Sequence, residues 1–205
     1  MGDRKKTETS IRRSAAAANE IELSLLADVG ELVGRAHDAE ESLRGLVALI
    51  ADRVRVDVCS LYLRQGEELV LRATHGLDPA SLGKVRMRTS EGLTGLAVEQ
   101  MKPVAVENAP GHPRFKYFPE TKEELFHSFL GVPLVERGEA LGVLVIQTRK
   151  PRRWTRAETL MMTAVAAQVV GTVVTATLLE SLEHAAEPRE PAVREARYQA
   201  LAGTP

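Results

Sequence analysis

The stretch from Phe126 to Arg149, FHSFLGVPLVERGEALGVLVIQTR, limits the fold more than any other part of this 205-residue chain. Two apolar runs, Phe129 to Val135 and Leu141 to Ile146, flank a short polar connection that contains Gly138. This pattern predicts an antiparallel hairpin, because glycine reaches a positive φ easily. Both sets of alternating residues in the second run are apolar. Since alternate residues of a strand point to opposite faces, both faces of the sheet must be covered.

Two glycines within these runs carry a further prediction. Gly131 precedes Val132 and Pro133, and Gly142 lies early in the return strand. A glycine in a strand leaves room for another backbone, a helix or a ligand to approach closely. The pair therefore indicates a sheet that supports a pocket.

The composition fits one domain with tails. With 44% hydrophobic residues and this length, the chain can bury one sizeable core. Its net charge of −1 provides no general attraction to nucleic acid or to an anionic membrane. Cys59 is the single cysteine, so no internal disulfide forms, and Met1 to Thr9 lacks the apolar region of a signal peptide. We expect a cytoplasmic protein with neither nucleic-acid nor membrane partners.

Apolar spacing predicts the order of elements along the chain. Helices are expected from Asn19 and after Asp38, each of which can cap a helix start. A hairpin is expected over 56–75, followed by an edge or half-exposed strand over 84–88 and a short strand ending at Val106. We expect a disordered basic arm over 1–18, a globular domain over 19–184 and a linker over 185–205.

The segment TSEGLTG places two glycines, Gly92 and Gly95, at the start of a predicted helix. Unpaired backbone amides at such a start can hold an anionic group. The same glycines would also allow a short helix to pack closely on the sheet, and the pattern alone does not separate the two interpretations.

A long connection over 107–127 follows, with three prolines and much of the aromatic content of the chain. A connection of this length in a compact domain is usually a lid, a pocket wall or a mobile segment. Its aromatic residues would form the wall of a site or anchor the loop on the core. They are Phe115, Tyr117, Phe118 and Phe126.

Beyond the hairpin, a basic segment over 149–156 leads into twenty uncharged residues, Leu160 to Leu179. The basic segment is expected to be a solvated loop. The uncharged stretch is long enough to span a membrane. Its Gln168, its threonines and the sheet directly before it favour a helix packed on that sheet, with the first helix and a second subunit on its other side.

The sequence offers no set of catalytic residues. The five histidines have no metal-ligand spacing, and no Walker or dinucleotide motif is present, so we expect no metal and no cofactor. His127 and Ser128 are adjacent, but neighbours in a strand point to opposite faces. Cys59 lies in a predicted strand, where a packed, inert thiol is the usual case.

The order of these segments resembles a GAF domain over roughly residues 20–183, with EGLTG, VEN, HPRF, FLGVPL and LGVLVI in sequence before a long helix. The resemblance implies an α+β fold with a six-stranded antiparallel sheet and helices on both faces. It also implies that the N- and C-terminal helices lie on one face of the sheet and form a dimer bundle, and that the other face of the sheet holds a small-molecule pocket.

Within this broad family, the stretches RMRTSEGLTGLAVEQMKPVAVENAPGHPRF and WTRAE are most similar to the N-terminal domain of nitrogen-related phosphoenolpyruvate-protein phosphotransferases. That similarity implies a sensor of nitrogen status, with glutamine and 2-oxoglutarate as signals, which controls autophosphorylation of a downstream phosphotransferase domain. The final LAGTP resembles the opening of that domain. The motifs of cyclic-nucleotide-binding, tetrapyrrole-binding and methionine sulfoxide reductase members are not matched.

We expect ligand to bind between the sheet and the aromatic loop. Thr94 and the amides from Gly92 to Gly95 are predicted to hold a carboxylate. The other predicted contacts are polar groups at His127 and Ser128, walls at Phe115 and Tyr117, and charge partners at Arg86 and Arg88. Two alternatives stay open: a dimerisation and docking module without ligand, or the sensor of a transcription activator or signalling kinase.

Overall fold

The computed structural model describes residues 24–32, 39–119 and 126–186. Its strands form one six-stranded antiparallel sheet in the order β3-β2-β1-β6-β5-β4, which confirms the predicted α+β fold. The predicted basic arm, the caps Asn19 and Asp38, and the chain from 187 onward lie outside the described residues. After a helix over 24–32, the helices and strands are α2 (Ala39–Val54), β1 (Val58–Gln65), β2 (Glu68–His75), β3 (Arg86–Arg88), α3 (Gly92–Gln100), β4 (Val104–Val106), β5 (Ser128–Glu136), β6 (Glu139–Thr148) and α4 (Arg156–Ala186).

The central hairpin consists of β5 and β6, as predicted. Arg137 and Gly138 form its turn with φ values of 51° and 85°, and β6 also pairs with β1, so it lies inside the sheet. On one face Leu144 and Ile146 join the first of two hydrophobic cores. On the other face Val143 and Val145 join the second. Both faces of β6 are therefore covered.

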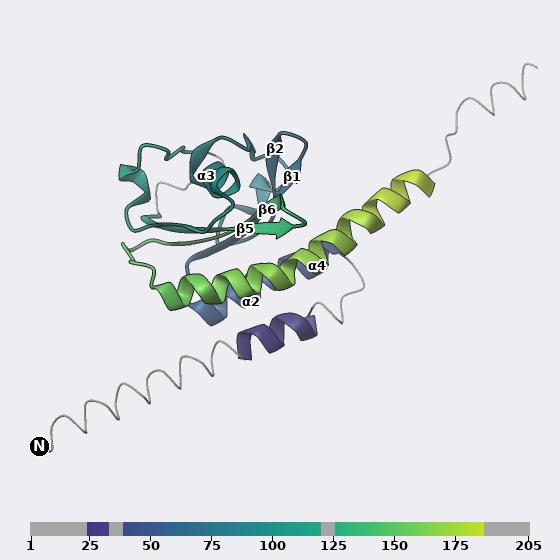
Figure 1. Cartoon of the computed structure of the whole chain (residues 1–205), viewed down its shortest axis with the longest axis horizontal. Helices are drawn as coiled ribbons and strands as arrows, with labels where there is room; N and C mark the ends of the chain where they lie inside the picture. Colours follow the sequence, from purple (N-terminus) through teal and green to yellow (C-terminus); the bar gives the residue numbers. More distant parts are fainter. Residues whose placement is uncertain (1–23, 33–38, 120–125, 187–205) are drawn as a thin grey trace, which may run out of the picture.

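The two faces carry different layers (Figure 1). The helices α2 and α4 pack on one face, together with the helix over 24–32, whose Leu25 and Val29 are buried in the same core. The short helix α3 and the loops beside it cover the other face. Cys59 is fully buried in the first of these cores, and burial raises the pKa of its thiol, in agreement with the predicted inert role.

Helix α4 begins with a capping box. The backbone N–H of Thr155 donates to Glu158 Oε2 over 2.8 Å, and the N–H of Glu158 donates to Thr155 Oγ1 over 3.2 Å. Arg152 forms an ion pair with Glu158 and stacks over the ring of Trp154, 4.5 Å from the ring centroid. Part of the basic segment is thus engaged with the helix start rather than simply solvated.

The part of α4 from Arg156 to Thr175 is long and apolar enough, by length and composition alone, to cross a membrane. Its inner side chains Met162, Val165 and Val169 are fully buried against the sheet and α2. This placement agrees with the prediction of a helix packed on the sheet.

The two glycines of the central hairpin face protein atoms. A Cβ at Gly142 would lie 2.2 Å from the carbonyl oxygen of Tyr62, and one at Gly131 would lie 2.8 Å from the ring of Phe129. The space that the missing side chains leave is thus filled by the neighbouring strand and by an aromatic ring. These glycines serve close packing of the sheet and do not open a pocket themselves.

Gly142→Ala is expected to destabilise the fold by about 1–3 kcal/mol, because the clash is with the backbone of a central strand that cannot rotate away. Urea unfolding measures the loss. Gly30→Ala is the matched control: nothing lies within 4 Å of its Cβ position in the helix over 24–32, and alanine there should add about 0.5–1 kcal/mol. Equal stability of Gly142→Ala and the wild type would contradict the close approach.

The capping box makes stability depend on pH. Burial by itself raises the pKa of Glu158, but hydrogen bonds from Thr155 and Arg152 outweigh it and hold the pKa below its ordinary value. A lowered pKa stabilises the fold above the ordinary carboxyl pKa, and this contribution is lost as pH falls through the folded-state value. Glu158→Ala should cost about 1 kcal/mol near neutral pH.

This cost should shrink as the pH of the unfolding measurement falls from about 7 through the ordinary carboxyl pKa, because the unfolded chain gains its proton first and the folded carboxylate gains it only at lower pH. Thr155→Ser, which keeps the capping oxygen, is the control and should stay close to the wild type throughout. A cost of Glu158→Ala that is independent of pH would refute the charged cap.

Candidate functional site

The start of α3 exposes backbone donors. Gly92 has a φ of +66°, and the N-cap residue Glu91 makes no side-chain capping hydrogen bond. The N–H of Gly95 donates to the carbonyl of Glu91 over 2.9 Å, so the amides of residues 92–94 precede the first helical donor and have no acceptor within the helix. The Glu91 carboxylate is engaged elsewhere, by the N–H of Arg88 at 3.1 Å and by Lys116. The helix start therefore keeps its partial positive charge.

A small cavity lies against this helix start. Its volume is about 20 Å³, room for about one water molecule. Three of the predicted site residues line it: Gly92, Thr94 and Phe115. The other lining residues come from β3, α3, the loop after β4 and the strands β5 and β6, and they are Met87, Leu93, Ala109, Lys116, Phe118, Phe129 and Gln147.

Gln147 is a lining residue that the sequence did not single out. It lies on β6, paired with Phe129 of β5 and Val58 of β1, and its side chain is 4% exposed. Among the residues that the structure describes, its Oε1 has no hydrogen-bond partner. An unpaired buried amide oxygen is costly and therefore informative. The sequence signal was a polar residue two positions after Val145, in the series that faces α3.

The loop over 107–119 is fastened to α3 across this cavity. Arg114 forms an ion pair with Glu99 at 3.0 Å, and its second Nη donates to the carbonyl of Ser90 over 2.6 Å. Lys116 Nζ lies 2.8 Å from Glu91 Oε1, and this hydrogen bond is the main cause that lowers the pKa of Glu91. The side chains in both ion pairs are more than a third exposed. Exposed pairs of this kind contribute about 0–1 kcal/mol each.

The structure places the other predicted residues away from the cavity lining. A Cβ on Gly95 would lie 2.8 Å from the carbonyl oxygen of Thr89, so this glycine permits close packing. Tyr117 is 39% exposed, and His127 is exposed while its backbone joins β6 through Thr148. Ser128 is buried and shares a hydrogen bond with the hydroxyl of Thr148 at 2.5 Å.

The two predicted arginines lie on the edge strand β3. Both are exposed. The guanidinium of Arg86 pairs with Glu68 of β2 at 3.2 Å, and the backbone of Arg88 is the donor to Glu91 described above. Within the described chain neither arginine lines the cavity.

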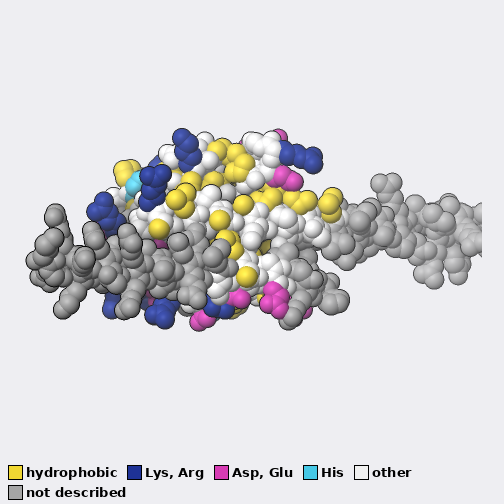
Figure 2. Space-filling model, turned by 60° about the horizontal axis from the view of Figure 1, so that its bottom comes forward, with side chains coloured by type: hydrophobic (Ala, Val, Ile, Leu, Met, Phe, Trp, Pro, Cys, Tyr) yellow, Lys and Arg dark blue, Asp and Glu magenta, His cyan; other side chains and the backbone are white. Residues whose placement is uncertain are grey.

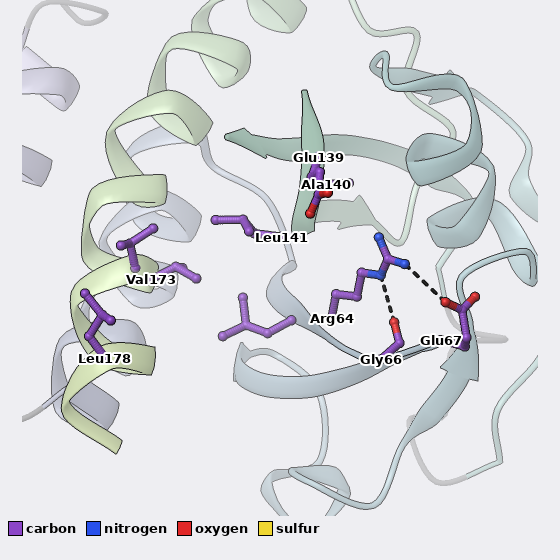
Figure 3. A pocket seen from close by; sticks show the side chains of 10 residues that line it. Arg64, Gly66, Glu67, Glu139, Ala140, Leu141, Val173 and Leu178 are labelled. Carbon is purple, nitrogen blue, oxygen red and sulfur yellow. Dashed lines mark hydrogen bonds and ion pairs between the residues drawn. The ribbon is translucent and has the colours of Figure 1, made fainter. Parts of the chain in front are cut away.

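A larger hollow lies on the opposite face, between α4 and the turns of the two hairpins (Figure 3). Its volume is about 490 Å³, and it is lined by Leu63, Leu141, Val173 and Leu178 with Arg64, Glu67 and Glu139 at its rim, among others. Arg64 is already bonded to the carbonyl of Gly66 at 2.7 Å and to Glu67 at 3.3 Å. This groove contains none of the predicted site residues. The cavity at α3 is the better candidate, because polar groups there lack partners.

Metal chemistry has no centre in the described residues, where no group of three histidine, cysteine, aspartate or glutamate side chains could hold an ion. The site offers backbone amides, one buried amide oxygen, one lysine and aromatic walls. Such groups can bind a small polar molecule.

Comparison with known proteins agrees with this architecture. The phosphoenolpyruvate-dependent phosphotransferase system protein of Escherichia coli is 33% identical over 149 residues, which are 72% of this chain and 20% of that protein. A Nif-specific regulatory protein of Azospirillum lipoferum is 29% identical over 135 residues, which are 63% of this chain and 22% of that protein. The chain thus spans about a fifth of the length of these relatives.

A solved structure is also similar over nearly its full length. The GAF domain from a phosphoenolpyruvate-protein phosphotransferase of Coxiella burnetii superposes with a TM-score of 0.73 at 33% identity, covering 78% of this chain and 96% of that one. The sequence profile of the GAF domain family matches residues 38–173. The chain therefore belongs to the GAF domain family.

Proposed function

We propose that this chain is a small-molecule-sensing regulatory domain whose ligand binds at the start of α3, beneath the loop over 107–119. One observation carries the proposal. Helix-start amides that precede the first helical donor, the buried side chain of Gln147 and an aromatic wall line one cavity. Thr94 and the amides of residues 92–94 would hold a carboxylate, and Phe115 would form a wall. A sensory role fits the Nif-specific regulatory relatives.

The cavity must grow to admit such a ligand, and the loop provides the means. Phe115, Lys116 and Phe118 are its loop-borne walls. The loop is held to α3 through exposed contacts of Arg114 and Lys116, which contribute little free energy each. The remaining walls lie on packed strands and on α3. Loop displacement would therefore enlarge the cavity while the polar groups on α3 and β6 stay in place, and it would take Phe115 and Phe118 from their contacts with the second core.

We further propose that the signal controls a downstream phosphotransferase in response to nitrogen status, with glutamine and 2-oxoglutarate as the candidate ligands. The support is the identity to the phosphotransferase system proteins, in which the matched segment makes up a fifth of the chain. Ligand acts by its different affinity for two arrangements of the domain. A cytoplasmic location fits this role.

A homodimer through the N- and C-terminal helices is part of the proposal. From Leu160 to Leu179 the sequence of α4 has no charge, and Leu160 and Leu178 are 57% and 60% exposed. Figure 2 shows hydrophobic side chains over the face where α4 lies, with charged side chains mostly toward its edges. An uncharged, partly exposed helix face of this kind favours helix–helix association.

A second candidate function is a dimerisation and docking module that binds no small molecule. The 20 Å³ volume of the cavity and the uncharged face of α4 favour it. The similarity to Nif-specific regulatory proteins favours another possibility, that the domain is the sensor of a transcription activator. A ligand screen separates the sensor from the docking module.

Thermal unfolding of the 205-residue chain with glutamine, 2-oxoglutarate, other amino acids and cyclic nucleotides provides that screen. A ligand at about a hundred times its Kd adds about 2.7 kcal/mol and raises Tm by several degrees. We expect such a shift with glutamine or 2-oxoglutarate and none with cyclic nucleotides. Unchanged Tm with every compound would favour the docking module.

The loop contacts predict a separate outcome without any ligand. The double variant Arg114→Ala/Lys116→Ala should speed amide hydrogen exchange over 107–119 by about tenfold, because the open form gains population when both ion pairs are lost. Exchange in β6 should stay unchanged. Arg86→Ala, which removes the ion pair with Glu68 on the edge strand, is the matched control. Loop exchange equal to the control would mean that these contacts do not hold the loop.

A further inference from the structure

An uncharged strip runs along one side of α4. It joins two leucines, Leu160 and Leu178, which are 57% and 60% exposed. They are 18 residues apart, which is about five full turns of an α-helix, so both side chains leave the helix on the same side. The residues between them on this side are exposed or half-buried, and the strip consists of Leu160, Ala164, Ala167, Gly171, Val174 and Leu178. A continuous apolar strip of this kind is typical of a surface that another chain covers.

The middle of the strip leaves room for a second helix. Gly171 lies inside α4, where glycine is less favourable than alanine. Within the described chain no atom lies within 4 Å of the place of its Cβ, so the packing of the described residues does not require a glycine. Ala167 and Gly171 are each two residues from position 169, and Leu160 and Leu178 are each nine residues from it. The strip can therefore pair with a copy of itself about a two-fold axis near residue 169.

The two ends of the strip carry different charges, and these decide the direction of the second helix. Arg149 and Arg152 of the basic segment form ion pairs with Asp57 and Glu158. The other three cations are exposed and have no ion pair among the described residues, and they are Lys150, Arg153 and Arg156. In Figure 2 most of the Lys and Arg side chains in view gather toward the left, the end at which α4 starts in Figure 1. The positive end of the helix dipole lies there too.

The other end of the strip borders the groove of Figure 3. Val174 and Leu178 line this groove, and Glu67 and Glu139 stand at its rim. Glu67 is paired with Arg64 at 3.3 Å. Glu139 is exposed and has no ion pair within the described chain, so the rim keeps one negative charge without a partner. The groove is thus an apolar surface with an acidic edge.

We propose that this groove receives the start of α4 from a second copy of the chain, so that the two α4 helices pack antiparallel. The inference rests on the homodimer of the proposed function and adds its direction and register. Leu160 of each copy then packs beside Leu178 of the other, and Arg153 and Arg156 face the acidic edge with Glu139. A parallel pair would bring together the free cations and the positive helix starts of both copies, and such like-charge contacts select against an arrangement.

The test uses the 205-residue chain with single cysteines on the strip. Native Cys59 is fully buried and does not compete. Leu160→Cys and Leu178→Cys replace exposed side chains, so both variants should fold. Glu107→Cys, at an exposed position just after β4, is the control for random collisions. Sedimentation gives the oligomeric state, and gel electrophoresis after mild oxidation gives the rate of cross-linking.

We expect a dimer in which a mixture of Leu160→Cys and Leu178→Cys cross-links at least about tenfold faster than Glu107→Cys, because only opposed cysteines come within disulfide distance. Each leucine variant alone should match the control, since its two cysteines lie about five helical turns apart across an antiparallel pair. Rapid cross-linking of a single variant alone, or a dimer in which the mixture does not exceed the control, overturns the inference and leaves the homodimer standing. A monomer at every concentration overturns both.

Charge reversal tests the direction independently. Arg156→Glu should raise the Kd of the antiparallel dimer by about threefold to tenfold, because two of its contacts become repulsive, and Glu139→Lys added to it should restore the wild-type Kd. Lys84→Glu, at an exposed cation away from α4, is the matched control. A dimer that Arg156→Glu strengthens or leaves unchanged overturns the antiparallel arrangement.

Discussion

The burial of β6 on both faces is the constraint on which the rest of the structure depends. Leu144 and Ile146 pack toward α2 and α4, and Val143 and Val145 pack toward α3. A strand in this position excludes water from both layers, so a polar side chain on it must find a partner or remain unsatisfied. Gln147 is the residue where this constraint is not met on the α3 side. The candidate site exists because the core is incomplete there.

The architecture was predictable because short sequence patterns of apolar, charged and glycine residues indicate its helices and strands. The paired apolar runs with Gly138 between them specify the hairpin, and the uncharged run from Leu160 specifies a helix that must pack on the sheet. The edge position of β3 follows from its alternating charges. Each of these signals lies within about twenty residues of sequence. Together they limit the fold to a sheet with covered faces.

The site was predictable only in part, because it is assembled from distant segments. The glycine pair indicated the helix start, and Gly92, Thr94 and Phe115 do line the cavity. Gln147 lies far along the chain from them, and one polar residue near the end of a strand has no distinctive pattern. The contact of Arg114 with Glu99 depends equally on how the loop folds back. For Arg86, the strand register brings Glu68 within reach, which composition alone does not reveal.

Strand β6 connects the cavity with α4 most directly, because its two faces contact the two sites. Gln147 faces α3, while its neighbour Ile146 packs in the core that α4 covers. Directly after β6, the N–H of Arg149 donates to the Asp57 carboxylate over 2.8 Å. Helix α4 then starts at Arg156, next to the Thr155–Glu158 capping box. Coupling between a ligand and a downstream domain requires an element with two arrangements that both sites bias. Under the proposed function, a ligand that displaces the loop would change the packing of β6 on the α3 face, and α4 packs on the opposite face.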